Sequence, residues 1–351
     1  MKPCLYLSFL ILIITGCNKS ADQLRSKIDS LTHQKPTEPN NPVDTNKPVK
    51  PDTGWFAIAP LPGPRTYATG FALGNKGYVC SGVIDLSDPH EPGYDDMLMY
   101  DPAKNSWTQK AGLPKLLYPN MGRHQPFSFV INNKAYAGGG LSIDGIGGQD
   151  IQEYDPVVDT WIPRAKLDPG VQFSESTATV CAGNAYIASY TTSPKALYIF
   201  DPTDNTVKKT YIFRINDNLQ SDGWLASDDI SLFYGYSGGP LIFLGNKPGS
   251  QEYSFFGSDS STIPIKPAPV QQGIFYKNSL YISFGDAGNL YRYNFTLKKW
   301  QALSLRKLGV TAGISTFLLG SKLYIIGGNN GVFSPSTNKA WAIDLDAYPE
   351  I

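Results

Sequence analysis

An eight-residue phrase that occurs twice constrains the fold of this chain more than any other feature. Residues 100–107 read Tyr-Asp-Pro-Ala-Lys-Asn-Ser-Trp, and residues 154–161 read Tyr-Asp-Pro-Val-Val-Asp-Thr-Trp. Each copy has the pattern of a strand, a tight turn at Asp-Pro, and a second strand that opens with a large aromatic residue. Repetition at this spacing predicts a repeat architecture. The phrase therefore predicts a fold, but it does not predict a chemistry.

Weaker copies continue the phrase along the chain. Residues 200–207 end in Val207 instead of Trp, residues 293–300 keep Trp300 without the Asp-Pro, and residues 341–346 contain only the first half. The missing second half stands at residues 55–62, whose pattern Trp-x-x-x-Ala-x-Leu-Pro matches that of residues 107–114. We therefore expect the first strand of the domain to pair with the last blade. This pairing would close a ring and leave no open strand edge.

A second repeated segment precedes the copies of the phrase. It combines a turn rich in Asn, Lys and Gly with an apolar strand that ends in small residues. It occurs at residues 75–82, 133–140, 183–189, 277–285 and 320–328. Together the two patterns resemble the kelch repeat. The resemblance implies an all-β, kelch-type β-propeller with four antiparallel strands per blade.

The spacing of equivalent positions predicts the number of blades. Third-strand positions recur about every 50 residues, which is the kelch period. They are Tyr100, Tyr154, Phe200, Tyr253, Tyr293 and Ile343. We therefore predict a six-bladed propeller, with five or seven blades as alternatives. The fourth copy is degenerate: residues 238–245 and 251–256 read as its middle strands, and no Trp follows them.

Composition agrees with a turn-rich β protein. The chain has 34 Gly, 27 Pro, 13% aromatic and only 17% charged residues, which is typical of a well-buried all-β domain. Its formal net charge is zero and it has no basic cluster, which argues against nucleic acid as a partner. We expect a monomer.

The N-terminus has the pattern of a lipoprotein signal peptide over residues 1–16. Lys2 is followed by an apolar run, residues 5–14, that is too short to span a bilayer permanently. The run ends in Ile-Thr-Gly-Cys, which resembles the bacterial lipobox. The resemblance implies that Cys17 becomes the lipidated first residue and anchors the protein to a membrane. An ordinary signal peptide with a chance Cys and an uncleaved anchor are the alternatives.

The predicted location is the cell envelope. Asn18 follows Cys17, so the Asp that retains some lipoproteins in the inner membrane is absent. This favours the outer membrane and leaves open which side the domain faces. Residues 17–54 form a polar, proline-rich linker whose last seventeen or so residues would reach roughly 50 Å at about 3.1 Å per residue. Residues 55–351 form the propeller.

Candidate binding residues stand where the chain approaches each innermost strand. In kelch propellers these approaches gather at one mouth of the ring. Carried over by position, they are Arg65, Thr66, Tyr67, Arg123, His124, Gln125, Phe173, Ser174, Glu175, Asp228, Asp229, Gln271, Gln272 and Thr311. Two arginines and a glutamate at one mouth would suit a carboxylate or a sugar. The alternative is that each arginine only braces the blades.

Metal and cofactor signals are weak. The segment of residues 85–96 contains five carboxylates, which could bind calcium, although no EF-hand spacing is present and a solvated loop is favoured. The three histidines, His33, His90 and His124, are scattered, so neither a zinc site nor a copper site is predicted. We expect no cofactor. The glycines at 138–140 and 145–148 read as a loop rim, because a phosphate cradle needs a following helix. Cys80 and Cys181 read as small core residues, with a disulfide as the less favoured alternative.

Two functions remain after these exclusions. The favoured one is a non-enzymatic, membrane-tethered module that engages a glycan or a protein through the mouth, since no catalytic set appears. The alternative follows from a distant resemblance to the sialic-acid mutarotases among bacterial kelch proteins. In that reading Glu175 would shuttle a proton, and Arg65 or Arg123 would hold the substrate carboxylate.

Overall fold

The computed structural model describes thirteen segments of the chain. They are residues 54–88, 93–116, 122–169, 171, 173–174, 176–189, 196–213, 224–235, 240–246, 253–262, 273–283, 286–331 and 334–348. The predicted signal peptide, Cys17 and nearly all of the linker lie outside them, as do Glu175, Gln271 and Gln272. Within the described segments the fold is an all-β propeller, with one short 3-10 helix, η1 (Leu345–Ala347), and no α-helix. No helix there is long and apolar enough to cross a bilayer.

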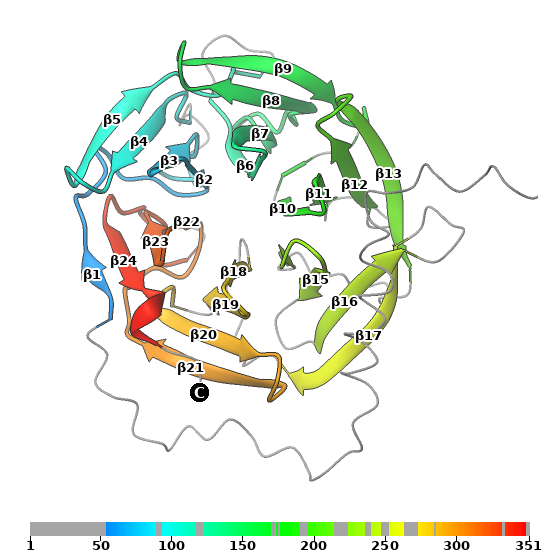
Figure 1. Cartoon of the computed structure of the whole chain (residues 1–351). Coiled ribbons are helices and arrows are strands. Elements are labelled where there is room, and N and C mark those ends of the chain that lie inside the picture. The colour runs from blue at the N-terminus through cyan, green and yellow to red at the C-terminus, as the bar shows by residue number, and fades with distance from the viewer. Residues whose placement is uncertain are drawn as a thin grey trace, which may run out of the picture.

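Four of the sheets are four-stranded, and they lie around a common centre (Figure 1). The first holds β2 (Thr69–Leu73), β3 (Lys76–Cys80), β4 (Met97–Asp101) and β5 (Ser106–Lys110). The second holds β6 (His124–Ile131), β7 (Lys134–Leu141), β8 (Asp150–Asp155) and β9 (Thr160–Lys166). Further along the chain come β18 (Ile274–Tyr276), β19 (Ser279–Ser283), β20 (Asn289–Asn294) and β21 (Lys299–Leu305). The last sheet holds β22 (Ser315–Leu319), β23 (Lys322–Ile326), β24 (Ala340–Asp344) and β1 (Phe56–Ala57).

The fifth sheet has eight strands, and this changes the predicted count. Its members are β10 (Thr177–Cys181), β11 (Asn184–Ser189), β12 (Ala196–Asp201), β13 (Thr206–Phe213), β17 (Tyr253–Thr262), β16 (Pro240–Asn246), β15 (Leu232–Gly235) and β14 (Trp224–Ser227), in that order across the sheet. The outer strands β13 and β17 pair in parallel at Ile212↔Tyr253 and Phe213↔Ser254. Because of this pairing, the described strands form five hydrogen-bonded sheets and not six separate ones.

In the degenerate fourth copy, the sequence analysis assigned the third strand one strand too far along the chain. Tyr253 begins β17, the fourth strand of its unit, whereas the sequence pattern put it on the third. The innermost strand of this unit is β14, which the sequence analysis did not predict. The copy lacks both the Tyr-Asp-Pro turn and the Trp, so nothing in the sequence fixed the order of its apolar runs.

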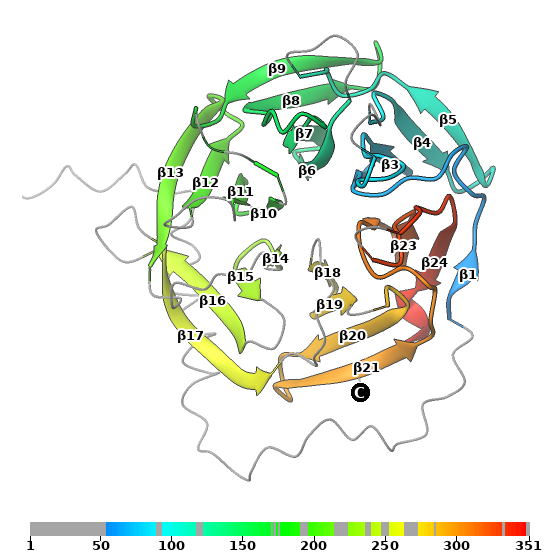
Figure 2. The same cartoon turned by 180° about the vertical axis from the view of Figure 1, so that it is seen from behind.

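The first and last described strands share one sheet. β1 pairs antiparallel with β24 at Phe56↔Ala342 and Ala57↔Trp341, and the Ile58 N–H extends the pairing to the Ala340 carbonyl at 3.1 Å. Figure 2 shows β1 beside β24 from behind. The N-terminal segment of the domain therefore supplies the outermost strand of the sheet that contains its C-terminal strands.

Each four-stranded unit has two distinct ends, because consecutive strands run in opposite directions. The short turns between first and second strands, and between third and fourth strands, lie at one end, which we call the turn end. The loops between second and third strands, and those leading to the next unit, lie at the other end, the mouth end.

The repeated phrase forms a clasp between neighbouring sheets. Asn105, in the left-handed region at φ 47°, accepts hydrogen bonds from the Tyr100 hydroxyl and the Ala59 N–H, both at 2.8 Å. The Trp107 Nε1–H donates to the Ala59 carbonyl, also at 2.8 Å. The second copy repeats this arrangement with Tyr154, Asp159 and Trp161 on Ala111, at 2.7, 3.0 and 2.8 Å. These two copies of the phrase therefore tie their sheets to the preceding ones as well as forming turns.

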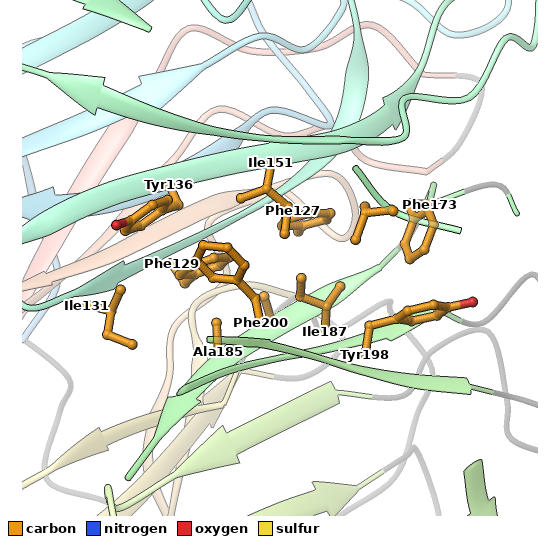
Figure 3. Close-up of a cluster of buried hydrophobic side chains, with 12 residues drawn as sticks. Phe127, Phe129, Ile131, Tyr136, Ile151, Phe173, Ala185, Ile187, Tyr198 and Phe200 are labelled. Carbon is orange, nitrogen blue, oxygen red and sulfur yellow. The ribbon is translucent and has the colours of Figure 1, made fainter. Parts of the chain in front are cut away.

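The hydrophobic core lies mainly between sheets (Figure 3). Phe127, Phe129 and Tyr136 from the second sheet pack against Ile187 and Phe200 of the next. Phe200 stands where the first two copies have Tyr, and it has no hydroxyl for a clasp. Apolar packing is supplemented here by Asp168, which accepts a hydrogen bond from the Tyr198 hydroxyl and pairs with Lys209 at 2.7 Å. Cys80 and Cys181 are buried in core clusters and form no disulfide with each other, which confirms that they are small core residues.

Candidate functional site

Three approaches to innermost strands meet at the mouth end through their backbones. Tyr67, Gln125 and Gly313 occupy equivalent places and all have positive φ, at 54°, 55° and 62°. The Gln125 N–H donates to the Tyr67 carbonyl at 2.7 Å, and the Tyr67 N–H donates to the Gly313 carbonyl at 2.8 Å. A left-handed conformation at Tyr or Gln costs on the order of 1 kcal/mol, so the surrounding structure must hold it in place. At this part of the mouth the backbone therefore has a strained conformation that its hydrogen bonds help to stabilise.

Arg65 is almost fully buried and paired with an aspartate of its own sheet. Its two terminal nitrogens donate to the two Asp96 carboxylate oxygens at 2.7 and 2.9 Å, and Nη1 also donates to the Ser81 carbonyl at 2.9 Å. The Tyr94 ring lies 3.9 Å from the guanidinium carbon. These contacts tie the approach to β2, the end of β3 and the start of β4 together.

Arg123 repeats this geometry in the second sheet. Its guanidinium donates to both Asp150 oxygens at 2.8 and 3.3 Å and to the Gly139 carbonyl at 3.0 Å. In both sheets an aspartate therefore occupies the Nη1–Nη2 edge of the guanidinium, one of the two edges that could hold a ligand carboxylate, and the Nε atom of the other edge is buried. Arg65 therefore braces its own sheet. Arg123 also donates through Nη2 to the carbonyl of Pro114, which follows β5, so it joins the second sheet to the first, in line with the alternative that an arginine braces neighbouring blades.

The described candidates that stand next to these arginines or at the equivalent approach are uncharged at neutral pH. Burial lowers the pKa of His124 to about 4, although hydrogen bonds with the Gln125 side chain and the Ser142 backbone act in the opposite direction. His124 is only 7% exposed, and its Nδ1 has no hydrogen-bond partner in the described structure. Thr66 donates through Oγ1 to the Gly313 carbonyl at 3.3 Å, and the half-buried Thr311 donates its N–H to the Asn329 carbonyl at 2.7 Å.

Some predicted site residues lie elsewhere. Asp228 and Asp229 follow β14 in the turn before β15, so they lie at the turn end and the prediction that they line the mouth is wrong. The error follows from the missed strand β14. Asp228 Oδ1 accepts the N–H groups of Ile230 and Ser231 at 3.1 and 2.6 Å, and the Asp229 carbonyl accepts the Ala182 N–H at 3.0 Å.

The third approach is described only in part. Phe173 and Ser174 are buried there, and the Phe173 carbonyl accepts the Gly140 N–H at 2.9 Å. Glu175 and Gln271 lie outside the described residues, so their place at the mouth stays a prediction.

Several carboxylates of the acidic segment have protein partners, one within the segment and two outside it. Asp85 Oδ1 accepts the Ser87 N–H and hydroxyl at 2.8 and 2.7 Å, Asp95 pairs with Lys115 at 2.6 Å, and Asp96 pairs with Arg65. No group of three potential metal ligands occurs among the described residues, and residues 89–92 of this segment are not among them.

Sequence reasoning missed Asp96 and Asp150, the partners of the arginines. A signal was available, because each aspartate stands four positions before the Tyr that opens a copy of the repeated phrase. An aspartate at a fixed place in two repeats, with an arginine before the preceding innermost strand of each, predicts a repeated ion pair.

Comparison with known proteins supports the propeller class. No protein-family model matches the chain. N-acetylneuraminate epimerase from Shigella sonnei (strain Ss046) is 34% identical over 92 residues, which cover 26% of this chain and 24% of that protein. The Escherichia coli (strain K12) N-acetylneuraminate epimerase is 33% identical over 92 residues, with the same coverage. The chain thus spans about a quarter of the length of the curated relatives it matches.

A solved structure covers far more of the chain. The protein described as "Structure of YjhT" aligns with a TM-score of 0.57 over 80% of this chain and 95% of that chain, at 16% identity. Identity this low shows the fold alone. Together these similarities place the protein among β-propellers and support the resemblance to the kelch type. The particular similarity to N-acetylneuraminate epimerases is distant and partial.

Proposed function

We propose that this protein is a membrane-anchored propeller of the cell envelope that binds a polar, uncharged ligand at its mouth end without altering it. The observation that carries this proposal is the pairing of Arg65 with Asp96 and of Arg123 with Asp150. With both guanidiniums engaged, the half-buried Gln125 and Thr311 beside them carry neutral amide and hydroxyl groups, which suit a glycan better than an anion. A protein loop is the other ligand class that such a mouth accommodates.

Glycan binding is tested with the full chain on a glycan array, followed by calorimetry on any hit. We expect Gln125→Gly to weaken binding at least tenfold. Glycine adopts the positive φ freely, so a loss would reflect the missing amide and not backbone strain. Gln109→Ala, on the exposed face of β5, is the matched control and should bind normally. An array without hits, or equal losses in both variants, would rule out glycan recognition at the mouth.

An epimerase or mutarotase is the second candidate, favoured by the 92-residue similarity to N-acetylneuraminate epimerases. In this reading Glu175 shuttles the proton, and Arg65 or Arg123 has to release its aspartate to hold the substrate carboxylate. Exchange between the anomers of N-acetylneuraminate can be followed by NMR. Acceleration that disappears in Glu175→Gln would overturn the binding-only proposal, and an unchanged exchange rate would overturn the enzymatic one.

We further propose that the eight-stranded sheet represents two blades joined at their outer edges, which gives six blades in all. Each half has the four-strand antiparallel order of the other units, and the β1–β24 pair then closes the ring. Deleting residues 55–61 should lower the melting temperature of the whole domain. Unchanged melting of the deletion variant would contradict closure by β1.

The proposed domain organisation is a signal peptide at residues 1–16, a lipidated Cys17, a linker to residue 54 and the propeller from residue 55 to 351. The lipobox resemblance and the absence of Asp at position 18 support an outer-membrane anchor. Mass spectrometry of the mature N-terminus should find an acylated Cys17, and Cys17→Ser should move the protein out of the membrane fraction. A mature protein that starts elsewhere would refute the anchor.

A further inference from the structure

The linker joins the propeller at the turn end. In the first sheet the register pairs Tyr100 with Trp107 and Asp101 with Ser106, directly at the turn between β4 and β5. Phe56 pairs with Ala342 in the last sheet, so continuing the register sets Gly54 opposite Asp344. The chain thus enters β1 at the place where the first sheet has its hairpin turn.

Exposed apolar side chains on several sheets lie at or near this same end. Among the described residues, the large apolar side chains with high exposure are Phe56, Val157, Val158, Ile230 and Leu297. Val157 and Val158 are 90% and 65% exposed in the β8–β9 turn, Ile230 lies in the β14–β15 turn, and Leu297 lies in the β20–β21 turn. Phe56 is the first residue of β1 and follows Gly54 by two positions, so it is also near this end. Single exposed apolar residues are ordinary, but their concentration at one end of a propeller requires an explanation.

Several lysines near the turn end are neutralised by carboxylates. Lys76 pairs with Asp101 at 2.9 Å, Lys134 with Glu153 at 3.0 Å, and Lys277 with Asp346 at 2.5 Å. These pairs reduce the positive charge that this end presents. This end suits the interfacial region of a bilayer, where apolar side chains insert and paired charges stay at the headgroups.

We propose that the turn end rests on the lipid surface to which Cys17 is anchored, so that the mouth end faces away from the membrane. This inference rests on the lipid anchor proposed above. Val157, Val158 and Leu297 are the principal inserting side chains, and each alone would bind lipid weakly. The tether of residues 18–53 makes the contact intramolecular, and this raises the effective concentration enough for weak insertion to set the orientation.

The experiment uses the full, lipidated chain in phosphatidylcholine vesicles, with an environment-sensitive fluorophore on one introduced cysteine. Val157→Cys reports on the turn end, and Asp144→Cys, on the exposed β7–β8 loop, reports on the mouth end. Cys80 and Cys181 are buried and should remain unlabelled. We expect blue-shifted, several-fold brighter emission at position 157, quenched by spin-labelled lipid, and water-like emission at position 144. A third variant carries Val157→Cys together with Val158→Asp and Leu297→Asp. The fluorophore at position 157 should then show water-like emission, while flotation with the vesicles and the melting temperature should not change.

The outcomes separate this inference from the anchor. Protein that floats with the vesicles while position 157 stays water-like, or while position 144 is quenched equally, overturns the proposed orientation and leaves the anchor intact. Protein that fails to float refutes the anchor and the docking together. A Val158→Asp/Leu297→Asp variant that keeps the lipid quenching at position 157 would also refute insertion by these turns.

Discussion

Trp55→Ala tests how much the pairing of the segment around β1 with β24, which we call the seam, contributes to the stability of the domain. Trp55 is 2% exposed and belongs to a core cluster with Leu290, Leu303 and Val310, which come from or follow the β18–β21 sheet. Its Nε1–H is shared between the Gly288 carbonyl and the Ser304 hydroxyl, each at 3.1 Å. The strand that follows pairs with β24, and Ala59 beyond it accepts the Trp107 indole N–H. One short segment therefore contacts three sheets.

The expected loss follows from burial and hydrogen bonding. A buried Trp removes roughly 150–250 Å² from water, worth about 4–6 kcal/mol at 25 cal/mol per Å² as an upper bound. Measured costs of Trp→Ala in cores are about 3–5 kcal/mol, so we expect about 4 kcal/mol. Trp55→Phe keeps most of the ring, and the Gly288 carbonyl still accepts the Ser304 hydroxyl at 2.8 Å, so about 1 kcal/mol should be lost.

The assay is urea denaturation followed by circular dichroism and by intrinsic fluorescence. Trp107→Phe is the matched control, because its indole makes one comparable bond from a half-buried position and its loss should also cost about 1 kcal/mol. Both probes should show one transition shifted to lower urea in Trp55→Ala. A loss below about 1 kcal/mol, or a separate early transition confined to one probe, would refute the idea that the seam stabilises the whole ring.

Three further outcomes test other contacts. Arg123→Ala leaves the Asp150 carboxylate without its pair and should cost about 3 kcal/mol in urea denaturation, whereas equal stability would mean that the brace is dispensable. Because the pKa of His124 is about 4 when folded and about 6.5 when unfolded, its contribution is complete above pH 6.5 and is lost as pH falls toward 4. His124→Gln should therefore flatten the acid side of the stability profile by up to about 3 kcal/mol, and an unchanged profile would contradict the buried neutral ring. A Cβ on Gly112 would lie 1.7 Å from the Asp95 carbonyl oxygen, so Gly112→Ala should lower stability by at least about 2 kcal/mol, and a wild-type melting temperature would disprove that contact.

The repeated phrase predicted the strands around it because its own side chains make the contacts that define them. Tyr100, Asn105 and Trp107 form one clasp, and the equivalent residues form the next, so pattern and geometry coincide. The split last copy likewise pointed to the pairing of residues 56–57 with β24. Where the side chains of a motif themselves join two strands or sheets, the sequence pattern is sufficient to predict that part of the fold.

The same reasoning failed where those side chains are absent. In the fourth unit no Tyr-Asp-Pro turn ends the third strand and no Trp opens the fourth, so β14 and β16 both read as short apolar runs of unknown order. An apolar run does not reveal its order within a blade, so Asp228 and Asp229 were assigned to the wrong end. The parallel β13–β17 contact joins segments distant in sequence, and no local pattern encodes such a pairing.

The repeats also provide an internal control for the site, because equivalent positions share a scaffold. Arg65 and Arg123 each pair with an aspartate of their own sheet and each have a buried Nε without a partner, as expected for framework residues. The following position differs: Thr66 binds the Gly313 carbonyl, whereas His124 leaves Nδ1 without a partner at the same place. A ligand that distinguishes one blade from another must contact positions where the blades differ. Substitutions that test ligand binding at the mouth should therefore start with His124 and Gln125. The two arginines, whose pairing with an aspartate is repeated in both sheets, stabilise the framework.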